Sequence, residues 1–151
     1  MIGGHDELTL DDHRKAFTEV SFLIELFAST VDELVGSATA SVGRVAGRMM
    51  GKRLPLHLPK PSLETVLEAL ARQLSGSFEL SYRCEGSSAE LTFGRCPIRK
   101  VCQVRDLPLD GETCRIFHAY FDGVVNELTA RPTKTELCSV GERCVARLAI
   151  K

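Results

Sequence analysis

The chain has 151 residues, of which 44% are hydrophobic and 26% are charged, and its formal net charge is −1. This length is typical of one domain that buries its own core, and the near-neutral charge excludes the basic excess that nucleic-acid binding usually needs. No apolar run reaches the roughly 18 residues of a membrane-spanning helix. We therefore expect one small soluble domain that binds no nucleic acid and does not span a membrane.

The N-terminal segment is predicted to be a long helix with one apolar side. Thr9, followed by acidic residues, is a typical helix start, and Gly36 is expected to end the helix. Apolar residues recur every three or four positions between them: Phe17, Val20, Leu23, Ile24, Phe27, Val31, Leu34 and Val35. Because this stripe is long for a helix that covers a small domain, we expect residues 1–36 to form a homodimerisation helix.

A second helix, over about residues 37–52, contains Gly43, Gly47 and Gly51, each one helical turn after the last. Glycine lowers helix stability by roughly 1 kcal/mol per residue relative to alanine. Two interpretations explain three such glycines. Either the helix packs closely against another element, or this face leaves room for a ligand or a partner protomer.

The rest of the chain predicts a sheet covered by helices. The expected elements are a helix that begins at Ser62, strands at 78–84 and 89–93, an irregular segment at 96–113, a helix at 114–128, and strands at 133–138 and 143–150. This order favours an α+β fold, in which an antiparallel β-sheet of about four strands packs against helices and long helices precede it.

Five of the six cysteines lie within 49 residues towards the C-terminus: Cys96, Cys102, Cys114, Cys138 and Cys144. The N-terminus does not resemble a secretory signal, so we expect a cytoplasmic protein whose thiols stay reduced. In that setting a cysteine cluster indicates a metal site, with zinc as the first choice and an iron–sulfur cluster as the alternative. Two other interpretations are that these are ordinary buried residues or that they form redox-active disulfides. Cys84 ends an apolar strand face and is expected in the core.

Three segments resemble one known family. They are Ser41–Gly47, the helix that Cys114 heads and that contains Gly123, and the closing Cys138-Ser-Val-Gly-Glu-Arg-Cys144. Together they are similar to the 4-vinyl reductase domain family, also described as hydrocarbon-binding, over about residues 37–150. The resemblance implies a fold shared with vesicle-tethering TRAPP subunits and dimerisation through N-terminal helices. Residues 37–151 would then be a ligand-binding domain for a small hydrophobic or aromatic molecule.

The resemblance also implies a metal-ligand set. In the aromatic sensors of this family, zinc is held by cysteines that match Cys114, Cys138 and Cys144, together with a glutamate. The position that matches the glutamate is Thr135, and Glu136 lies one residue too near, which on a strand turns its side chain to the opposite face. Cys96 and Cys102 are an additional pair that could supply the missing ligand.

The fourth predicted helix offers candidates for a ligand pocket against the sheet. Its lining would be Phe93, Phe117, His118, Phe121 and Val125, and the metal would hold the pocket in shape without doing chemistry. The competing interpretation is a packed core without a cavity. Because the domain has no DNA-binding or ATPase part, a sensory signal would pass to a partner protein. Two other functions stay open: an iron–sulfur redox or oxygen-responsive protein, and an enzyme of the cysteine site, either a reductase accessory or a hydrolase.

Overall fold

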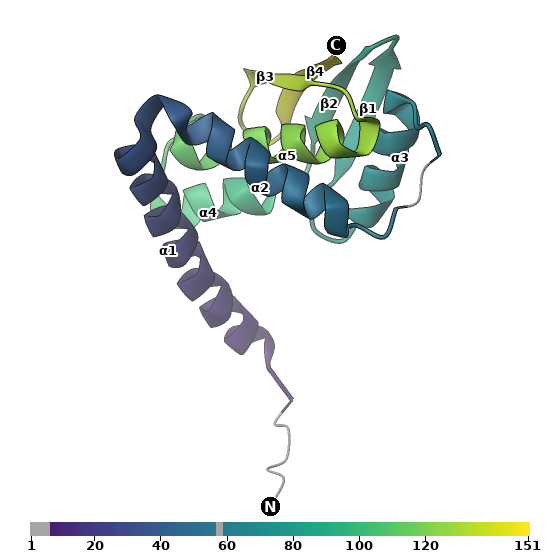
Figure 1. The fold of residues 1–151 in the computed structure, drawn as a ribbon. Helices are drawn as coiled ribbons and strands as arrows, with labels where there is room; N and C mark the ends of the chain where they lie inside the picture. The colour runs from purple at the N-terminus through teal and green to yellow at the C-terminus, as the bar shows by residue number, and fades with distance from the viewer. Residues whose placement is uncertain (1–6, 57–58) are drawn as a thin grey trace, which may run out of the picture.

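The structure is a computed structural model that describes residues 7–56 and 59–151 (Figure 1). Its elements are α1 (Leu10–Val35), a short 3₁₀ turn (Gly36–Ala38), α2 (Thr39–Arg53), α3 (Leu63–Gln73), β1 (Leu80–Glu85), β2 (Ser88–Phe93), α4 (Pro97–Arg105), α5 (Glu112–Thr129), β3 (Thr133–Ser139) and β4 (Cys144–Ile150). The predicted α+β class is confirmed. Among the described residues, no helix combines the length and the apolar character that crossing a membrane requires.

The four strands form one antiparallel sheet in the order β1-β2-β4-β3. Leu91 of β2 lies opposite Ala146 of β4, so the alternating apolar residues of the two central strands face the same side. Successive side chains of a strand point to opposite faces, and the buried side chains of β2 and β4 therefore form one floor for the core. Both predicted hairpins are present, although β1 begins two residues later than expected.

The helices α3 and α5 cover this face of the sheet, and α2 packs on the outer side of α5. α3 and α5 contribute the buried side chains that pack against the sheet, including Leu67, Leu70, Phe121 and Val125. α2 crosses the outer side of α5, and α1 extends away from the body towards the N-terminus (Figure 1). The core therefore lies between the sheet and the α3–α5 layer, while the other face of α5 contacts α2.

The ends of α1 agree with the sequence. The Thr9 hydroxyl accepts a hydrogen bond from the backbone N–H of Asp12 at 3.2 Å, and the Asp12 carboxylate accepts one from the backbone N–H of Thr9 at 2.8 Å. This reciprocal pair satisfies donors that the first turn leaves free. Gly36 ends the helix with φ at 49°, in the left-handed region where a side chain would be strained.

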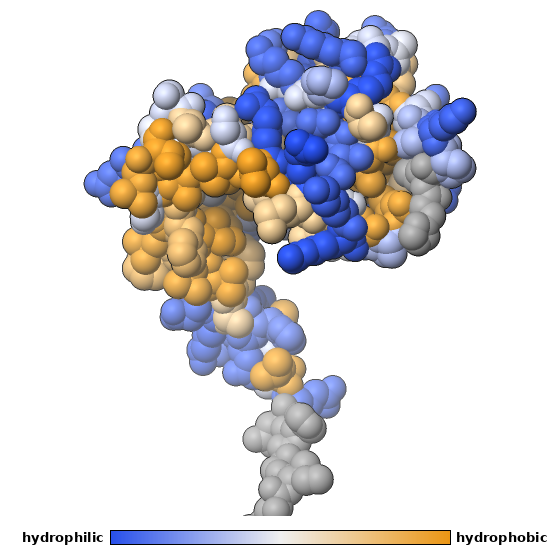
Figure 2. All heavy atoms as spheres, viewed as in Figure 1, coloured by the Kyte–Doolittle hydropathy of each residue, from blue (hydrophilic) through white to orange (hydrophobic). Residues whose placement is uncertain are grey.

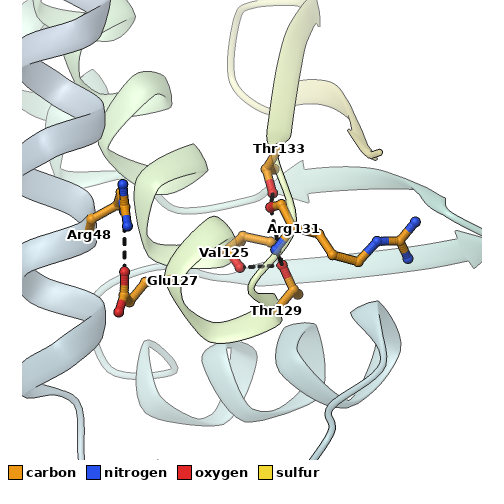
Figure 3. A network of polar contacts seen from close by, with 6 residues as sticks. All are labelled: Arg48, Val125, Glu127, Thr129, Arg131 and Thr133. Atoms are coloured by element: carbon orange, nitrogen blue, oxygen red, sulfur yellow. Dashed lines mark hydrogen bonds and ion pairs between the residues drawn. The ribbon is translucent and has the colours of Figure 1, made fainter.

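The C-terminal end of α5 is fixed to its neighbours by polar contacts (Figure 3). The Thr129 hydroxyl donates to the carbonyl of Val125 at 2.8 Å and accepts from the backbone N–H of Arg131 at 3.3 Å. On the side facing α2, the Arg48 guanidinium donates to the Glu127 carboxylate at 3.2 Å. These contacts hold the turn into β3 and link the C-terminal end of α5 to α2.

The prediction of irregular structure between Cys96 and Thr113 is wrong for the first half of this segment, where residues Pro97–Arg105 form α4. Pro97 occupies the first helical position, where the missing N–H is no loss. The Cys96 sulfur accepts a weak hydrogen bond from the backbone N–H of Arg99 at 3.5 Å, so Cys96 caps the helix. The turn signals at Pro108 and Gly111 apply only to the short connection that follows Asp106.

Candidate functional site

A large apolar groove lies between the helices, with a cavity volume of about 700 Å³. Its lining is Ile24, Phe27, Ala28 and Val31 of α1, Val42, Gly43, Ala46 and Met50 of α2, Leu70 of α3, Pro97 and Ile98 of α4, and Thr113, Ile116, Phe117, Tyr120, Phe121 and Val124 of α5, together with Leu54, Gln73, Leu74 and Phe78. Only Gln73, Thr113 and Tyr120 bring polar side-chain groups to this surface. The groove is thus built to receive an apolar molecule with few polar atoms.

The wall formed by α2 depends on the glycines that the sequence singled out. A Cβ added to Gly47 would lie 1.9 Å from the carbonyl oxygen of Tyr120, and one added to Gly123 would lie 2.2 Å from that of Arg44. The two helices therefore touch backbone to backbone, which confirms close helix–helix packing as the reason for the glycines. Gly43 also lines the groove, so the same crossing forms one of its walls.

Aromatic rings separate this groove from the interior behind it. Phe78 and Phe117 stack with centroids 5.1 Å apart, and both line the groove. Phe93, which is 1% exposed, makes edge-to-face contacts with Phe117, His118 and Phe121 at 5.8 to 6.0 Å. Edge-to-face pairs add stability beyond their buried area. The aromatic layer is therefore a rigid back wall for the groove.

The predicted pocket residues are divided between two sides of this layer. Phe117 and Phe121 line the groove, whereas Phe93 and Val125 lie in the core against the sheet. His118 faces the other side, where its Nδ1 is buried without a hydrogen-bond partner among the described residues. Burial lowers the pKa of His118 below its ordinary value of 6.5, so the ring is neutral at pH 7.

Four of the cysteines gather behind the aromatic layer, around one buried arginine. Arg99 is 9% exposed, and its guanidinium donates to the carbonyl of Phe93 at 3.2 Å and to the sulfur of Cys144 at 3.5 Å. The sulfurs of Cys102 and Cys114 lie 3.9 Å apart, within hydrogen-bond reach for sulfur. A small cavity of about 10 Å³ borders Cys96, Cys114 and Cys144. The fifth cysteine, Cys138, lies apart on β3 and is exposed.

Burial keeps three of these thiols protonated. It raises the pKa of Cys96 and of Cys102, and it raises the pKa of Cys114 furthest, with the nearby Cys102 adding to the effect. A buried thiolate without a compensating charge is disfavoured. Cys96, Cys102 and Cys114 are therefore neutral thiols at pH 7.

The predicted zinc or iron–sulfur centre is wrong. In residues 7–56 and 59–151, no group of three or more histidine, cysteine or acidic side chains could hold a metal ion. The physical reasons lie in the neighbours. The cationic guanidinium of Arg99 occupies a position beside Cys144, where it would repel a metal cation, and Cys138 lies on the surface.

The glutamate of the expected ligand set is absent as well. Thr135, which stands at its position, donates its hydroxyl to Asp122, and the Glu136 carboxylate pairs with Lys134 at 3.3 Å on the surface. Neither interaction involves a cysteine. The ligand set that the family resemblance implied does not fit this chain.

The sequence did not identify two features of the site. Arg99 lies in a segment that was predicted to be irregular, so nothing indicated that it was buried. The second feature is the part of the groove lining that α2 contributes, namely Val42, Ala46 and Met50. These residues are four positions apart, so their helical spacing could have identified them as one face of the helix. The α1 lining comes from the stripe that the sequence assigned to dimerisation.

No known protein family matches the sequence, and no curated protein does. The fold is similar to solved H-NOX structures. One comes from work on heme distortion in the H-NOX family, with a TM-score of 0.48, 14% identity, and coverage of 100% of this chain and 77% of that one. A second comes from work on H-NOX activation, with a TM-score of 0.48, 14% identity, and coverage of 97% and 75%. A third is a mutant of the T. tengcongensis H-NOX protein, with a TM-score of 0.46, 15% identity, and coverage of 97% and 76%.

Proposed function

We propose that the chain is a sensory domain that binds a small hydrophobic or aromatic molecule in the groove between α1, α2, α3 and α5. The observation that carries this proposal is the cavity of about 700 Å³ with its almost wholly apolar lining. Ligand sites in proteins are typically hollows of about 300 to 1,000 Å³, mostly apolar, with a few placed polar groups. Water in such a groove is poorly hydrogen-bonded, so an apolar ligand that displaces it gains free energy.

The predicted pocket residues take different parts in this proposal. Phe117 and Phe121 offer ring surfaces to the ligand, and Gln73, Thr113 and Tyr120 set its orientation through their polar atoms. Phe93, His118 and Val125 support those rings from behind and do not touch the ligand. The groove is open on one side, and this favours a ligand that can exchange with solvent, as a sensor requires.

The proposed protein acts as a homodimer through α1. Val20, Leu23 and Phe27 are 51%, 52% and 69% exposed, although all three are large and apolar. Figure 2 shows apolar side chains gathered over α1 and its turn into α2. Large apolar patches of this kind mark interaction sites on soluble proteins. A second copy packed on α1 would cover the stripe, and because Phe27 also lines the groove, it would help to close the ligand site.

This proposal divides the chain at Gly36, with residues 1–36 as the dimerisation helix and residues 37–151 as the ligand-binding body. The resemblance to the 4-vinyl reductase domain supports a hydrocarbon ligand but not its metal. The six cysteines are free, which suits a reducing compartment such as the cytoplasm. Ligand binding would change how α1 sits on the body, and a protein partner would read that change.

The test uses 8-anilino-1-naphthalenesulfonate, an aromatic dye that fluoresces in apolar sites. Ala46→Trp places a large ring in the groove, whereas Val45→Trp adds the same ring one residue away, at an exposed position outside the lining. We expect the wild type and Val45→Trp to bind the dye alike and Ala46→Trp to bind about tenfold more weakly, which is about 1.4 kcal/mol. Equal binding by all three proteins, with unchanged circular dichroism, would contradict the proposed site.

A further inference from the structure

The four gathered thiols fall into two kinds by their contacts. The sulfurs of Cys96 and Cys144 both accept hydrogen bonds from Arg99, at 3.5 Å each. Cys102 and Cys114 instead have each other as partners, with their sulfurs 3.9 Å apart. Neither the groove nor the proposed dimer uses this pair. A disulfide joins two sulfurs at about 2.05 Å, so these two sulfurs lie roughly 2 Å beyond bonding distance.

We propose that Cys102 and Cys114 are a redox-active dithiol that a low-molecular-weight disulfide, such as glutathione disulfide, oxidises reversibly to a bond between α4 and α5. Cys114 reacts first, because it is partly exposed whereas Cys102 is fully buried. The Cys114 thiol loses its proton as its sulfur attacks one sulfur of the oxidant, and the departing glutathione thiolate takes up that proton, which leaves a mixed disulfide and one glutathione. Cys102 then attacks the Cys114 sulfur and releases the second glutathione. Two protein thiols are oxidised, and one glutathione disulfide is reduced to two glutathiones.

The position of the pair connects it to the groove, and this part of the inference rests on the proposed function. Cys114 follows Thr113, which lines the groove, and Cys102 lies on α4, whose first residues Pro97 and Ile98 also line it. Drawing the two helices together narrows that end of the groove. We therefore expect the oxidised protein to bind apolar molecules more weakly than the reduced one.

The far end of α4 transmits the same movement to α1. Arg105, three residues after Cys102, donates to the Glu25 carboxylate at 2.5 Å, and its guanidinium lies 4.6 Å from the centre of the Phe22 ring. Glu25 is adjacent to Ile24, which lines the groove. A disulfide that shifts α4 therefore acts on two walls of the groove, one on α5 and one on α1.

The first experiment measures the bond and needs no ligand. The folded full chain is incubated with glutathione disulfide, its remaining thiols are alkylated, and a proteolytic digest is examined by mass spectrometry. We expect a cross-linked peptide that joins Cys102 to Cys114, reversed by dithiothreitol. Cys114→Ser should remove it, and Cys138→Ser, at an exposed thiol outside the group, should leave it intact. A cross-link between Cys96 and Cys144, or glutathione adducts without any cross-link, would overturn the proposal.

The chain unfolded in guanidinium provides the control for selectivity, since unfolded thiols pair without a preference for Cys102 and Cys114. Mapping the wild type in this way also keeps the test valid if Cys114→Ser folds poorly. A native digest with the same mixture of pairings as the unfolded chain would count against the dithiol.

The second experiment compares binding of 8-anilino-1-naphthalenesulfonate to the reduced and oxidised wild type. We expect at least a fivefold weaker affinity after oxidation, restored by dithiothreitol, and no change on oxidation of Cys114→Ser. If the disulfide between Cys102 and Cys114 forms while dye affinity stays constant, the proposed effect of this bond on the groove is wrong. Failure of the reduced protein to bind the dye would overturn the proposed function and leave the disulfide established, so the two failures are distinguishable.

Discussion

The two sides of α5 differ in chemistry although the same helix carries both. The side that faces α2 and the groove presents Phe117, Tyr120 and Phe121, which leave a hollow of about 700 Å³. The side that faces α4 presents Cys114 and His118 beside a cavity of only about 10 Å³. The first side stays open because two backbones in contact fix the distance between helices, and the second side closes because small thiols pack around Arg99. The sizes of the two cavities therefore depend on how closely α2 and α4 can pack against α5.

The largest expected effect comes from breaking the crossing of α2 and α5 with Gly47→Ala. The new Cβ would lie 1.9 Å from a backbone oxygen that cannot rotate away, so the helices must separate. We expect a loss of about 3 kcal/mol of unfolding free energy, measured by urea denaturation, at the upper end of the range for overpacking. Gly76→Ala is the control, because nothing lies within 4 Å of its added Cβ. Equal losses in both variants would show that the crossing is not rigid.

The side with the thiols is tested by Arg99→Met, which removes the charge and its donors while keeping the bulk of the side chain. The carbonyls of Phe93 and Gly94 would lose donors at 3.2 and 2.7 Å. Buried acceptors left without a partner cost about 2 kcal/mol in total. Urea denaturation measures the loss, and Arg95→Met, at an exposed position, should change stability by less than about 0.5 kcal/mol. An unchanged midpoint for Arg99→Met would mean that these carbonyls find other donors.

The smallest effect concerns the protonation of His118. Burial lowers the pKa of His118 in the folded chain, whereas in the unfolded chain the pKa stays near its ordinary value of about 6.5. As the pH falls, the unfolded chain therefore binds this proton before the folded chain does. Stability should therefore fall as pH decreases from 7 through the ordinary histidine pKa towards the lowered value in the fold. Thermal melts at pH 7 and 5.5 measure the fall, which His118→Gln should reduce and His13→Gln, on exposed α1, should preserve. The same fall in all three proteins would assign it to other groups.

The site was harder to predict than the fold for a physical reason. Thr9, Ser62 and the apolar stripes act through contacts a few residues away, so they located helix starts and buried faces correctly. Cys96-Pro97 was interpreted as a loop, although a capping sulfur and a proline at the first position are compatible with a helix start. The cysteine spacing indicated a metal site, and this prediction was wrong. The sequence does not show that a buried arginine contacts Cys144 or that Cys138 lies apart on the surface.

Local patterns of the sequence are enough for the α+β class and the sheet of two hairpins, because periodicity acts through near neighbours wherever the chain folds. They left two interpretations of Gly43, Gly47 and Gly51 open. Only the tertiary structure decided that Ala46 and Phe117 border one hollow, that Arg99 lies among the thiols, and that Cys138 stands apart from them. These facts depend on the distances between helices and strands. Those distances are set by packing between residues that are far apart in the sequence, and no local pattern encodes them.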